Sequence, residues 1–344
     1  MSAPAPARPA APPVPTLKSV AALAGVSTAT VSRFLNAPAV VAPDTGDRIR
    51  AAIAETGYVP NLLAGGLASS RSRLVSVIVP SVGQSIFNDT VDAIVEELAL
   101  AGYSVMLGLS GEDDGRLATV LDAAIARRPD GIILTGSNLS EPFRAKLRAA
   151  GIAVIETWDL PPAPMDMAIG FSHVAVGRAL GAFLADRGYR RPHVISASGV
   201  RARHRLEGLM QMLVERGLPP PTVDFLGGST RFGEGRQRFG TLADRGDPLP
   251  DVILCSSDWL AQGVLIEAQM RGIAVPDRLS VIGFGNLRMA AEMEPAITSV
   301  DINGRAIGAH AAAALLARAA GQVPPATTDV GFSIVERETT RSAA

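Results

Sequence analysis

The stretch Thr16–Asn36, TLKSVAALAGVSTATVSRFLN, predicts two short helices joined by a tight turn. Thr16 suits the N-cap of the first helix, because its side-chain oxygen can accept a hydrogen bond from an otherwise unpaired backbone N–H. Gly25 can adopt the left-handed conformation that ends a helix, and Ser27 can cap the helix that follows. Two helices joined in this way form a helix-turn-helix, whose second helix enters the major groove of DNA.

The predicted second helix has an inward face and an outward face. Val31 and Leu35 fall at helical spacing and are expected to point inward. The outward side chains offer hydroxyls and a guanidinium that can reach bases and phosphates, and they are Thr28, Ala29, Ser32 and Arg33. A third helix is predicted to begin at Pro43 and to end at Gly57. We expect it to close a small core over Ala24, Val31, Ile49 and Ile53.

Charge is distributed unevenly along the chain. The formal net charge is −1, but residues 1–73 contain seven Arg or Lys and only three Asp or Glu. This segment therefore carries +4 and the remainder −5. A basic N-terminal part joined to a mildly acidic body favours phosphate binding confined to the N-terminus.

Length and composition indicate a chain of two or three domains, since it has 344 residues, of which 47% are hydrophobic. Its single cysteine, Cys255, excludes an intrachain disulfide and fits a reducing compartment. The sequence contains no run of eighteen apolar residues and no secretion-signal pattern at its start. We therefore expect a cytoplasmic protein that does not cross a membrane.

Composition also divides the chain into segments. Residues 1–15 are rich in Ala and Pro and are predicted to form a disordered tail, and residues 16–60 form the helix-turn-helix domain. Residues 61–73 form either a simple tether or a hinge that wedges an apolar side chain into the minor groove of DNA. Residues 74–340 form the fourth segment, for which an effector-binding and dimerisation domain is expected.

From Leu74 onward, apolar strands alternate with amphipathic helices. Strands are predicted at 74–80, 103–109, 130–136, 153–158, 191–197, 222–227, 251–257 and 279–285. Helices are predicted near 87–100, 114–128, 141–150, 174–187, 202–217, 232–244, 258–271 and 301–321. This alternation is typical of parallel sheets covered by helices on both faces. The fold class predicted is thus a small all-α helix-turn-helix head followed by an α/β double lobe with two parallel-sheet subdomains.

The boundaries of the two lobes follow from the same pattern. One lobe comprises about 74–172 and 302–331, and the other about 173–301 and 332–340. Ligands of such folds bind beyond the C-terminal ends of the strands. The strand ends of interest are Pro80-Ser81, Thr135-Gly136, Glu156 to Asp159, Ser198 onward, Ser256 to Asp258 and Phe284 to Asn286.

Several kinds of catalytic chemistry have no support in the sequence. The four histidines are scattered without the spacing of metal ligands. The glycine-rich runs GGSTRFGEG and GFGNLR lack the order of a phosphate-binding loop, and no nucleophile elbow is present. We therefore predict no catalytic residues, no metal and no cofactor, and an enzyme is the weaker interpretation.

Three motifs occur in order along the chain, AGVSTATVSRFLN, GYVPN and SSDWLAQG. Together with the double lobe they resemble the lactose/galactose repressor family of bacterial transcription regulators, whose lobes are similar to periplasmic binding proteins. The resemblance covers residues 16 to about 338. Several blocks, among them VIVPSVGQSIF, AVIETWDLPPAPMDMAIGF and TDVGF, resemble the gluconate-repressor branch.

The resemblance implies a set of DNA-binding residues. Thr28 and Ala29 fall at its base-reading positions, and Leu67 falls on a leucine that wedges into the centre of the operator. The full set is Thr16, Ser27, Thr28, Ala29, Thr30, Ser32, Arg33, Asn36, Tyr58, Asn61, Ala64 and Leu67. The chain departs from the family at Gly65-Gly66, where each Gly costs a helix about 1 kcal/mol relative to Ala. A hinge helix would therefore form less readily here.

The resemblance also implies an effector site between the lobes. Its residues are Ser81, Phe87, Glu156, Trp158, Asp159, Arg205, Ser257, Asp258 and Asn286. Arg205 falls on the ligand-binding arginine of the family, and its guanidinium can hold a carboxylate or a phosphate through two hydrogen bonds. Gly285-Asn286 stands where many sugar-binding members carry an acidic pair, which favours an anionic effector.

Some of these residues have alternative roles. Asp258 either contacts the ligand or caps the following helix, and Trp158 either stacks on the ligand or packs in the core. Glu156 would repel a carboxylate unless it binds hydroxyls at the other end of the ligand. Without the resemblance, the Arg-rich stretch around Arg205 favours its interpretation as a surface helix arginine.

Taken together, the sequence predicts a homodimeric or tetrameric repressor that binds a pseudo-palindromic double-stranded DNA operator. No leucine heptads follow Ile334, so a dimer is the default. The expected effector is a sugar acid such as gluconate, with a neutral or phosphorylated sugar as the alternative. A solute-binding protein of a transporter and a sugar-processing enzyme are the competing classes.

Overall fold

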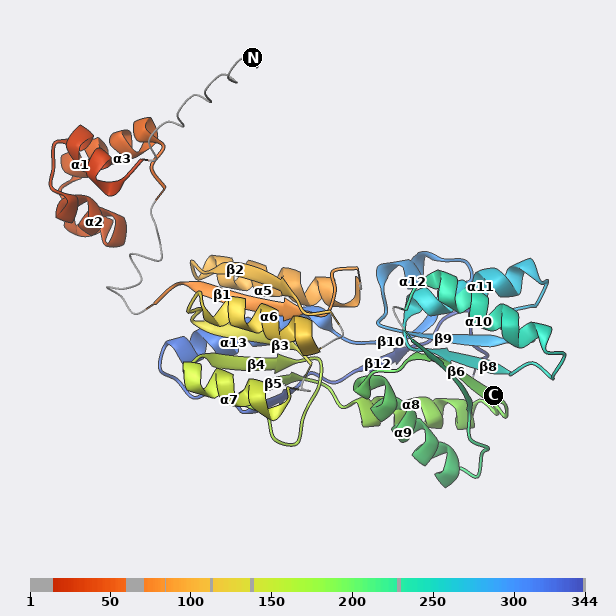
Figure 1. Cartoon of the computed structure of the whole chain (residues 1–344). Coiled ribbons are helices and arrows are strands. Elements are labelled where there is room, and N and C mark those ends of the chain that lie inside the picture. The colour runs from red at the N-terminus through yellow and green to blue at the C-terminus, as the bar shows by residue number, and fades with distance from the viewer. Residues whose placement is uncertain are drawn as a thin grey trace, which may run out of the picture. The chain divides into compact units, whose positions relative to one another are not determined.

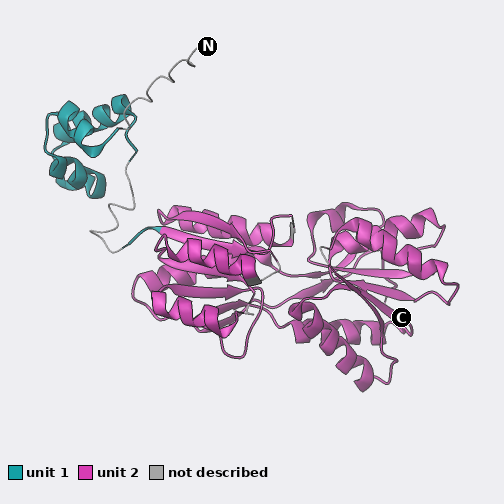
Figure 2. Cartoon of the chain, in the orientation of Figure 1, with its two compact units in different colours: residues 1–73 teal, residues 74–344 magenta. Residues whose placement is uncertain are grey.

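The computed structural model describes residues 15–59, 71–83, 85–111, 114–136, 139–227 and 230–342. The chain divides into two compact units, residues 1–73 and residues 74–344 (Figures 1 and 2). The tail predicted at 1–15, apart from its last residue, lies outside the described residues, as do Asn61, Ala64, Gly65-Gly66 and Leu67 of the predicted hinge.

The first unit contains the predicted helix-turn-helix. Its elements are α1 (Leu17–Ala24), α2 (Thr28–Asn36), the 3-10 turn η1 (Pro38–Val40) and α3 (Pro43–Thr56). Thr16 caps α1 in a reciprocal capping box with Ser19, and Gly25 ends that helix at φ +63°. The Ser27 hydroxyl accepts from the backbone N–H of Thr30 at 3.1 Å. The predictions for these three capping positions are confirmed.

The core of the first unit is built from small and β-branched side chains. Its buried residues are Val20, Ala21, Ala24, Val31, Phe34, Ile49 and Ala52. Leu35 packs against this core but is only half-buried, whereas Phe34, which the sequence analysis did not assign, is buried. Gly46 on α3 makes room for the Phe34 ring, because a Cβ atom at Gly46 would lie 3.0 Å from Cε2 of that ring.

The second unit consists of two lobes, each built on a six-stranded sheet. The sheet of the first lobe is parallel throughout and has the order β11-β5-β4-β3-β1-β2. Its strands are β1 (Leu74–Val79), β2 (Ser104–Leu109), β3 (Gly131–Thr135), β4 (Ala153–Thr157), β5 (Met167–Gly170) and β11 (Thr327–Asp329). The first lobe also contains η2 (Ser85–Phe87), α5 (Asn88–Leu100), α6 (Asp114–Ile125), α7 (Glu141–Ala150) and α13 (Gly304–Ala319).

The sheet of the second lobe has the order β12-β10-β9-β8-β6-β7, and only the β10–β12 pair is antiparallel. Its strands are β6 (Pro192–Ala197), β7 (Thr222–Leu226), β8 (Val252–Cys255), β9 (Ser280–Phe284), β10 (Thr298–Asp301) and β12 (Ser333–Val335). Its helices are α8 (His173–Asp186), α9 (Val200–Glu215), α10 (Phe232–Asp244), α11 (Asp258–Met270) and α12 (Arg288–Glu292).

Every strand and helix predicted from the alternating pattern is present. Five further elements were not predicted, and they contain only three to five residues each: β5, β10, β11, β12 and α12. Segments this short do not contain enough turns or alternations for a period to be visible in the sequence.

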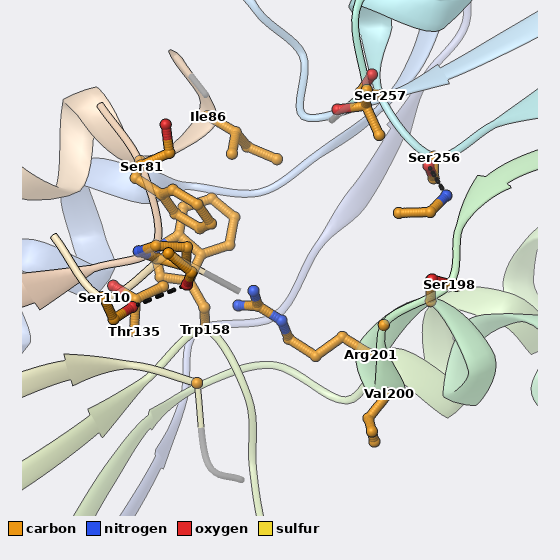
Figure 3. A pocket seen from close by; sticks show the side chains of 18 of the residues that line it. Ser81, Ile86, Ser110, Thr135, Trp158, Ser198, Val200, Arg201, Ser256 and Ser257 are labelled. Atoms are coloured by element: carbon orange, nitrogen blue, oxygen red, sulfur yellow. Dashed lines mark hydrogen bonds between the residues drawn. The ribbon is translucent and has the colours of Figure 1, made fainter. Parts of the chain in front are cut away.

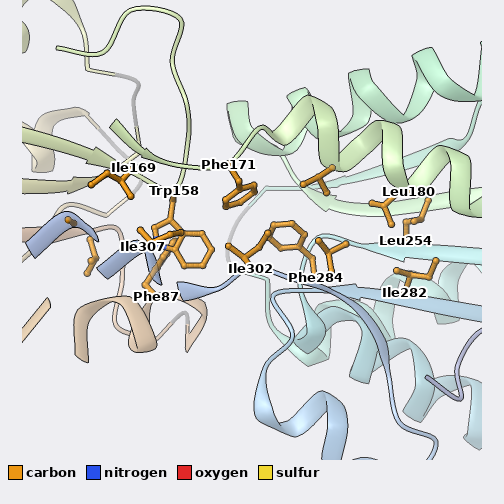
Figure 4. Close-up of a cluster of buried hydrophobic side chains, with 14 of the residues drawn as sticks. Phe87, Trp158, Ile169, Phe171, Leu180, Leu254, Ile282, Phe284, Ile302 and Ile307 are labelled. Carbon is orange, nitrogen blue, oxygen red and sulfur yellow. The ribbon is translucent and has the colours of Figure 1, made fainter. Parts of the chain in front are cut away.

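The chain passes between the lobes three times, between β5 and α8, between β10 and α13, and between β11 and β12. Apolar side chains at these crossings join the interiors of the two lobes into one cluster (Figure 4). Phe171 and Ile302 lie on the crossing segments, next to Phe284 at the end of β9. Because three segments cross side by side, the lobes are connected by a compact hinge region, which is separate from the predicted hinge at 61–73.

Among the described residues, none of the helices combines the length and the apolarity that a bilayer crossing requires. None of the described His, Cys, Asp and Glu residues form a group that could hold a metal ion.

Candidate functional site

The exposed face of α2 presents a small set of polar side chains. Thr28, Ala29 and Arg33 are exposed, and Ser32 is half-buried. The hydroxyl of Ser27, which caps the helix, lies 2.9 Å from the hydroxyl of Thr30. Three of the predicted contact residues are therefore presented without obstruction within this unit.

The other predicted DNA-binding residues of the described chain have structural partners. Thr16 is engaged in the capping box of α1. The Asn36 side chain donates to the carbonyl of Ser32 at 2.9 Å and so closes the end of α2. Tyr58 is half-buried against the core of the first unit. These residues can shape the surface around α2 as well as contact DNA.

The second unit contains a cavity of about 790 Å³ between its two lobes. This volume lies within the range of ordinary small-molecule sites. Side chains at the ends of parallel strands line it from both lobes, as the strand-end rule predicts. Figure 3 shows Ser81, Ser110 and Thr135 on one side of the cavity and Ser198, Ser256 and Ser257 on the other.

The charged groups on the described part of the cavity wall are all of one sign. Arginines from both lobes line it, namely Arg116, Arg201, Arg205 and Arg231. No Asp or Glu is found among the described residues that line the cavity. The described wall therefore combines cationic groups with hydroxyls, which suits a ligand that is both anionic and hydroxylated.

Arg205 is held by contacts on two sides. Its Nη1 atom lies 3.0 Å from Nδ1 of His173, and its Cζ atom lies 4.1 Å from the centre of the Phe284 ring. The Nε2 atom of His173 lies 2.9 Å from the carbonyl oxygen of Trp158. A carbonyl can only accept, so we assign the histidine proton to Nε2, which leaves Nδ1 to accept from Arg205.

The protonation states of this pair follow from burial. Desolvation, together with the nearby cations Arg205 and Arg201, lowers the pKa of His173 to about 2. Desolvation and the charge of Arg201 lower the pKa of Arg205 to about 9, while the carboxylate of Asp159 acts in the opposite direction. At neutral pH, His173 is therefore neutral and Arg205 remains a cation whose positive charge is poorly solvated.

Aromatic rings line the cavity floor and continue into the hinge region. Phe87 packs edge-on against Trp158 with ring centres 5.1 Å apart, and Trp158 packs edge-on against Phe171 at 6.0 Å. The indole N–H of Trp158 donates to Thr90 at 3.1 Å. Because Trp158 is only 2% exposed, the observed role of its ring is packing.

Five of the predicted effector residues line the cavity, and they are Ser81, Phe87, Trp158, Arg205 and Ser257. The remaining four, Glu156, Asp159, Asp258 and Asn286, are not among the lining residues.

Two of these four lie in the first lobe. Glu156 is fully buried, and its carboxylate accepts from the backbone N–H of Met165 at 2.7 Å and from Arg144 at 3.2 Å. The Asp159 carboxylate accepts from the N–H of Leu160 at 2.9 Å. These bonds use the carboxylates to hold the chain segment that follows β4.

The other two lie at the strand ends of the second lobe. Asp258 is fully buried and accepts from the hydroxyl of Ser299 at 2.6 Å and from the N–H of Leu287 at 2.7 Å. The side chain of Asn286 donates to Asp301 at 3.0 Å and accepts from Arg337 at 2.7 Å. Both side chains therefore bind neighbouring loops and strands of the fold.

Other polar residues that line the cavity were not among the nine predicted effector residues. Three of them lie at strand ends where a ligand was expected, namely Thr135, Ser198 and Ser256. The others are Ser110, Arg116, His173, Arg201, Thr230 and Arg231. Two signals were present for part of this set. Ser110 and Ser198 directly follow predicted strands, and Arg201 lies four residues before Arg205, on the same face of one helix. The rim arginines Arg116 and Arg231 had no local signal.

Comparison with family models gives two matches. Residues 16–61 match the model described as "Bacterial regulatory proteins, lacI family". Residues 182–340 match the model described as "Periplasmic binding protein-like domain".

Individual proteins match over nearly the whole chain. The "HTH-type transcriptional regulator GntR" of Pseudomonas aeruginosa is 35% identical over 329 residues, which cover 95% of this chain and 96% of the relative. A solved lacI-family transcriptional regulator from Silicibacter pomeroyi matches with a TM-score of 0.88 and 31% identity, covering 95% of this chain and 99% of that one. The lac repressor dimer bound to operator and the anti-inducer ONPF matches with a TM-score of 0.82 and 26% identity, covering 95% and 99%.

Proposed function

The chain belongs to the lacI family of bacterial regulatory proteins and is a DNA-binding transcriptional regulator, and we propose that it is a repressor answering to an anionic sugar of the gluconate type. In this proposal the first unit binds the operator and the cavity of the second unit binds the effector. Effector binding then changes the arrangement of the two lobes about the hinge region between them, and this changes the affinity of the protein for DNA.

The effector class rests on one observation. The described wall of the cavity carries four arginines and seven hydroxyl side chains, and none of its residues is acidic. A sugar acid supplies a carboxylate for the guanidiniums and hydroxyls for the Ser and Thr side chains. A neutral sugar would bring no negative charge to the poorly solvated guanidinium of Arg205.

We assign DNA recognition to the exposed side chains of α2. Thr28 and Ala29 would contact base edges, while Arg33 would contact phosphates or bases. The assignment is supported by their exposure and by the charge of +4 carried by residues 1–73. Asn61, Ala64 and Leu67 remain proposed contacts of the hinge segment.

The names of the relatives also support proposals for the oligomeric state and for the effector. The Pseudomonas aeruginosa relative is named GntR, and the lac repressor is described as a dimer bound to operator. We accordingly propose a homodimer on a pseudo-palindromic operator, since a two-fold protein matches a two-fold site. A chromosomal operator implies that the protein acts in the cytoplasm.

The proposed division of the chain is a DNA-binding domain at 16–60, a hinge at 61–73 and an effector domain at 74–340.

A gel shift of the full chain tests this function. The DNA is the region upstream of its own gene, in low salt, with and without gluconate, phosphorylated gluconate or glucose. We expect a shifted band that gluconate changes and glucose does not.

Two variants locate the sites. Arg33→Ala should weaken the shift, because a phosphate or base contact is lost, while Arg205→Ala should abolish the response to gluconate. A band that responds to glucose but not to either anion would refute the effector class while leaving the DNA-binding role intact.

A further inference from the structure

We propose that Arg201 is a second anion-binding residue, which reaches across the cavity and holds the acid group of the effector together with Arg205. This inference rests on the proposed function, because it requires an anionic effector. It names a specificity-determining residue outside the effector site expected from the sequence.

The position of Arg201 on its helix brings the two guanidiniums to the same cavity. Helix α9 begins at Val200, so Arg201 lies in its first turn and Arg205 one turn later. Residues four apart share one face of a helix, and both arginines line the cavity. In Figure 3 the side chain of Arg201 extends from α9 into the cavity toward Trp158.

Arg201 contacts the opposite lobe. Its Cζ atom lies 5.7 Å from the centre of the Phe87 ring, within the range of a cation–π contact. Phe87 precedes α5 in the first lobe, whereas α9 belongs to the second. The Phe87 ring is itself fixed by its edge-on contact with Trp158 at 5.1 Å. The guanidinium of Arg201 is therefore held near the wall opposite the helix that carries it.

Arg205 differs in how it is anchored. Its guanidinium stacks on Phe284 and bonds His173, and both of those residues belong to the second lobe. The positive charge of Arg201 is close enough to lower the pKa of Arg205. A carboxylate bound by both guanidiniums would offset this repulsion. The attraction of each cation to the carboxylate exceeds the repulsion between the two cations.

The two arginines therefore have different consequences for the lobes. An acid group held by Arg205 alone is attached to the second lobe. An acid group that also binds Arg201 contacts a side chain that lies against the first lobe. Binding of the effector then favours the lobe arrangement in which Arg201 and Arg205 both reach the acid group. Arg201 thus contributes to affinity for the charged group and to the conformational response.

The test compares three variants of the full chain, Arg201→Gln, Arg201→Lys and the control Arg203→Gln. Arg203 is on the same helix but is exposed, donates to the carbonyl of Ser198 at 3.0 Å and does not line the cavity. Gluconate affinity is measured by calorimetry without DNA. The unfolding midpoint is followed through fluorescence of Trp158 and Trp259, which are both in the second unit.

We expect Arg201→Gln to weaken gluconate binding by roughly tenfold or more, as loss of a charge-assisted hydrogen bond does. Arg201→Lys keeps the charge but not the two-pronged geometry and should give an intermediate loss. Arg203→Gln should bind gluconate as the wild type does. All three should unfold at the wild-type midpoint within about 2 °C, since none removes a core group.

Three outcomes would contradict this inference, and they can be told apart. If the wild type binds gluconate and Arg201→Gln binds it within twofold, the role of Arg201 is refuted and the proposed function stands. Equal losses in Arg201→Gln and Arg203→Gln would also refute it, because a general effect of helix charge would then explain both. If the wild type binds neither gluconate nor phosphorylated gluconate, the proposed function and this inference fail together.

Discussion

At the scale of single residues, His173 connects the ligand arginine to the hinge region. It is the first residue of α8, directly after the crossing from β5, and it is only 3% exposed. Its ring accepts from Arg205 at 3.0 Å and donates to the carbonyl of Trp158 at 2.9 Å. His173 also lines the cavity, but both of its ring nitrogens are engaged in these two contacts, so we interpret it as a residue that positions Arg205.

Replacing this histidine tests the interpretation. His173→Phe retains a ring of similar size but removes both hydrogen bonds, so Arg205 loses a fixed orientation in a half-buried site. We expect the dissociation constant for gluconate to rise by roughly tenfold, the typical effect of a hydrogen bond to a charged group. Calorimetry measures it, with His310→Phe as the control, because His310 is an exposed residue of α13. An unchanged dissociation constant in His173→Phe would contradict the positioning role.

The same residue makes a prediction for stability against pH. The pKa of His173 is about 2 in the folded protein, whereas its ordinary value, expected in the unfolded chain, is 6.5. Between these two pH values only the unfolded chain binds a proton at this histidine. Stability must therefore fall as the pH drops below 6.5. Between pH 7 and pH 5 we expect a loss of about 2 kcal/mol from this group.

Urea unfolding followed by tryptophan fluorescence measures this loss. His173→Phe should lose about 2 kcal/mol less than the wild type over the same pH interval, because its side chain does not titrate. The burial of His193 also lowers its pKa, so part of the acid sensitivity should persist in the variant. Identical losses in the two proteins would show that His173 is not the neutral group described above.

At the scale of elements, the placement of α9 depends on its close crossing with α8. A Cβ atom at Gly177 of α8 would lie 1.9 Å from the carbonyl oxygen of Arg205. A Cβ atom at Gly208 of α9 would lie 2.0 Å from the carbonyl oxygen of Val174. The two helix backbones therefore touch through glycines, and this contact positions the helix that carries Arg201 and Arg205.

A single methyl group should disturb this crossing. Gly208→Ala forces the backbones apart, so we expect a stability loss of about 1–3 kcal/mol, the usual effect of overpacking, together with weaker gluconate binding. Gly233→Ala on α10 is the matched control, because a Cβ atom there would meet nothing within 4 Å. Urea unfolding by tryptophan fluorescence compares the two. A Gly208→Ala protein as stable as Gly233→Ala would show that the crossing tolerates a side chain.

At the scale of the whole molecule, effector and operator must influence each other reciprocally. If gluconate weakens DNA binding by some factor, DNA must weaken gluconate binding by the same factor, typically 5–150-fold. Gluconate titration of the free protein and of the protein–DNA complex gives one factor, and DNA titration with and without gluconate gives the other. Unequal factors would mean that the two ligands do not act through a common equilibrium of this protein.

The pH dependence of effector binding distinguishes a carboxylate from a phosphate. The pKa of His173 is about 2 and that of Arg205 about 9, so neither group titrates between pH 6.5 and pH 8. Gluconate, whose carboxylate is fully ionised there, should bind with an affinity constant within about threefold. A phosphate gains charge as the pH rises through its second pKa of about 6 and should bind more tightly. Calorimetry without DNA makes the comparison.

The elements of this protein could be predicted because their signals are local. The caps at Thr16 and Ser27, the turn at Gly25 and the apolar strands depend on residues only a few positions apart. Hydrogen bonding at helix ends and the different periods of helices and strands act over that range. Short elements such as β11 and β12 form because a neighbouring strand pairs with them, so their own sequence gives little indication.

The sequence by itself determined the helix-turn-helix, the α/β alternation and the strand ends at which a ligand site forms. Only the tertiary structure decided which polar side chains reach that site. Glu156 and Asp258 bond to the fold and do not line the cavity, whereas Arg201 lines it beside Arg205. The physical reason is that a polar side chain finds its partner across strands and lobes, at distances in sequence over which no local pattern acts.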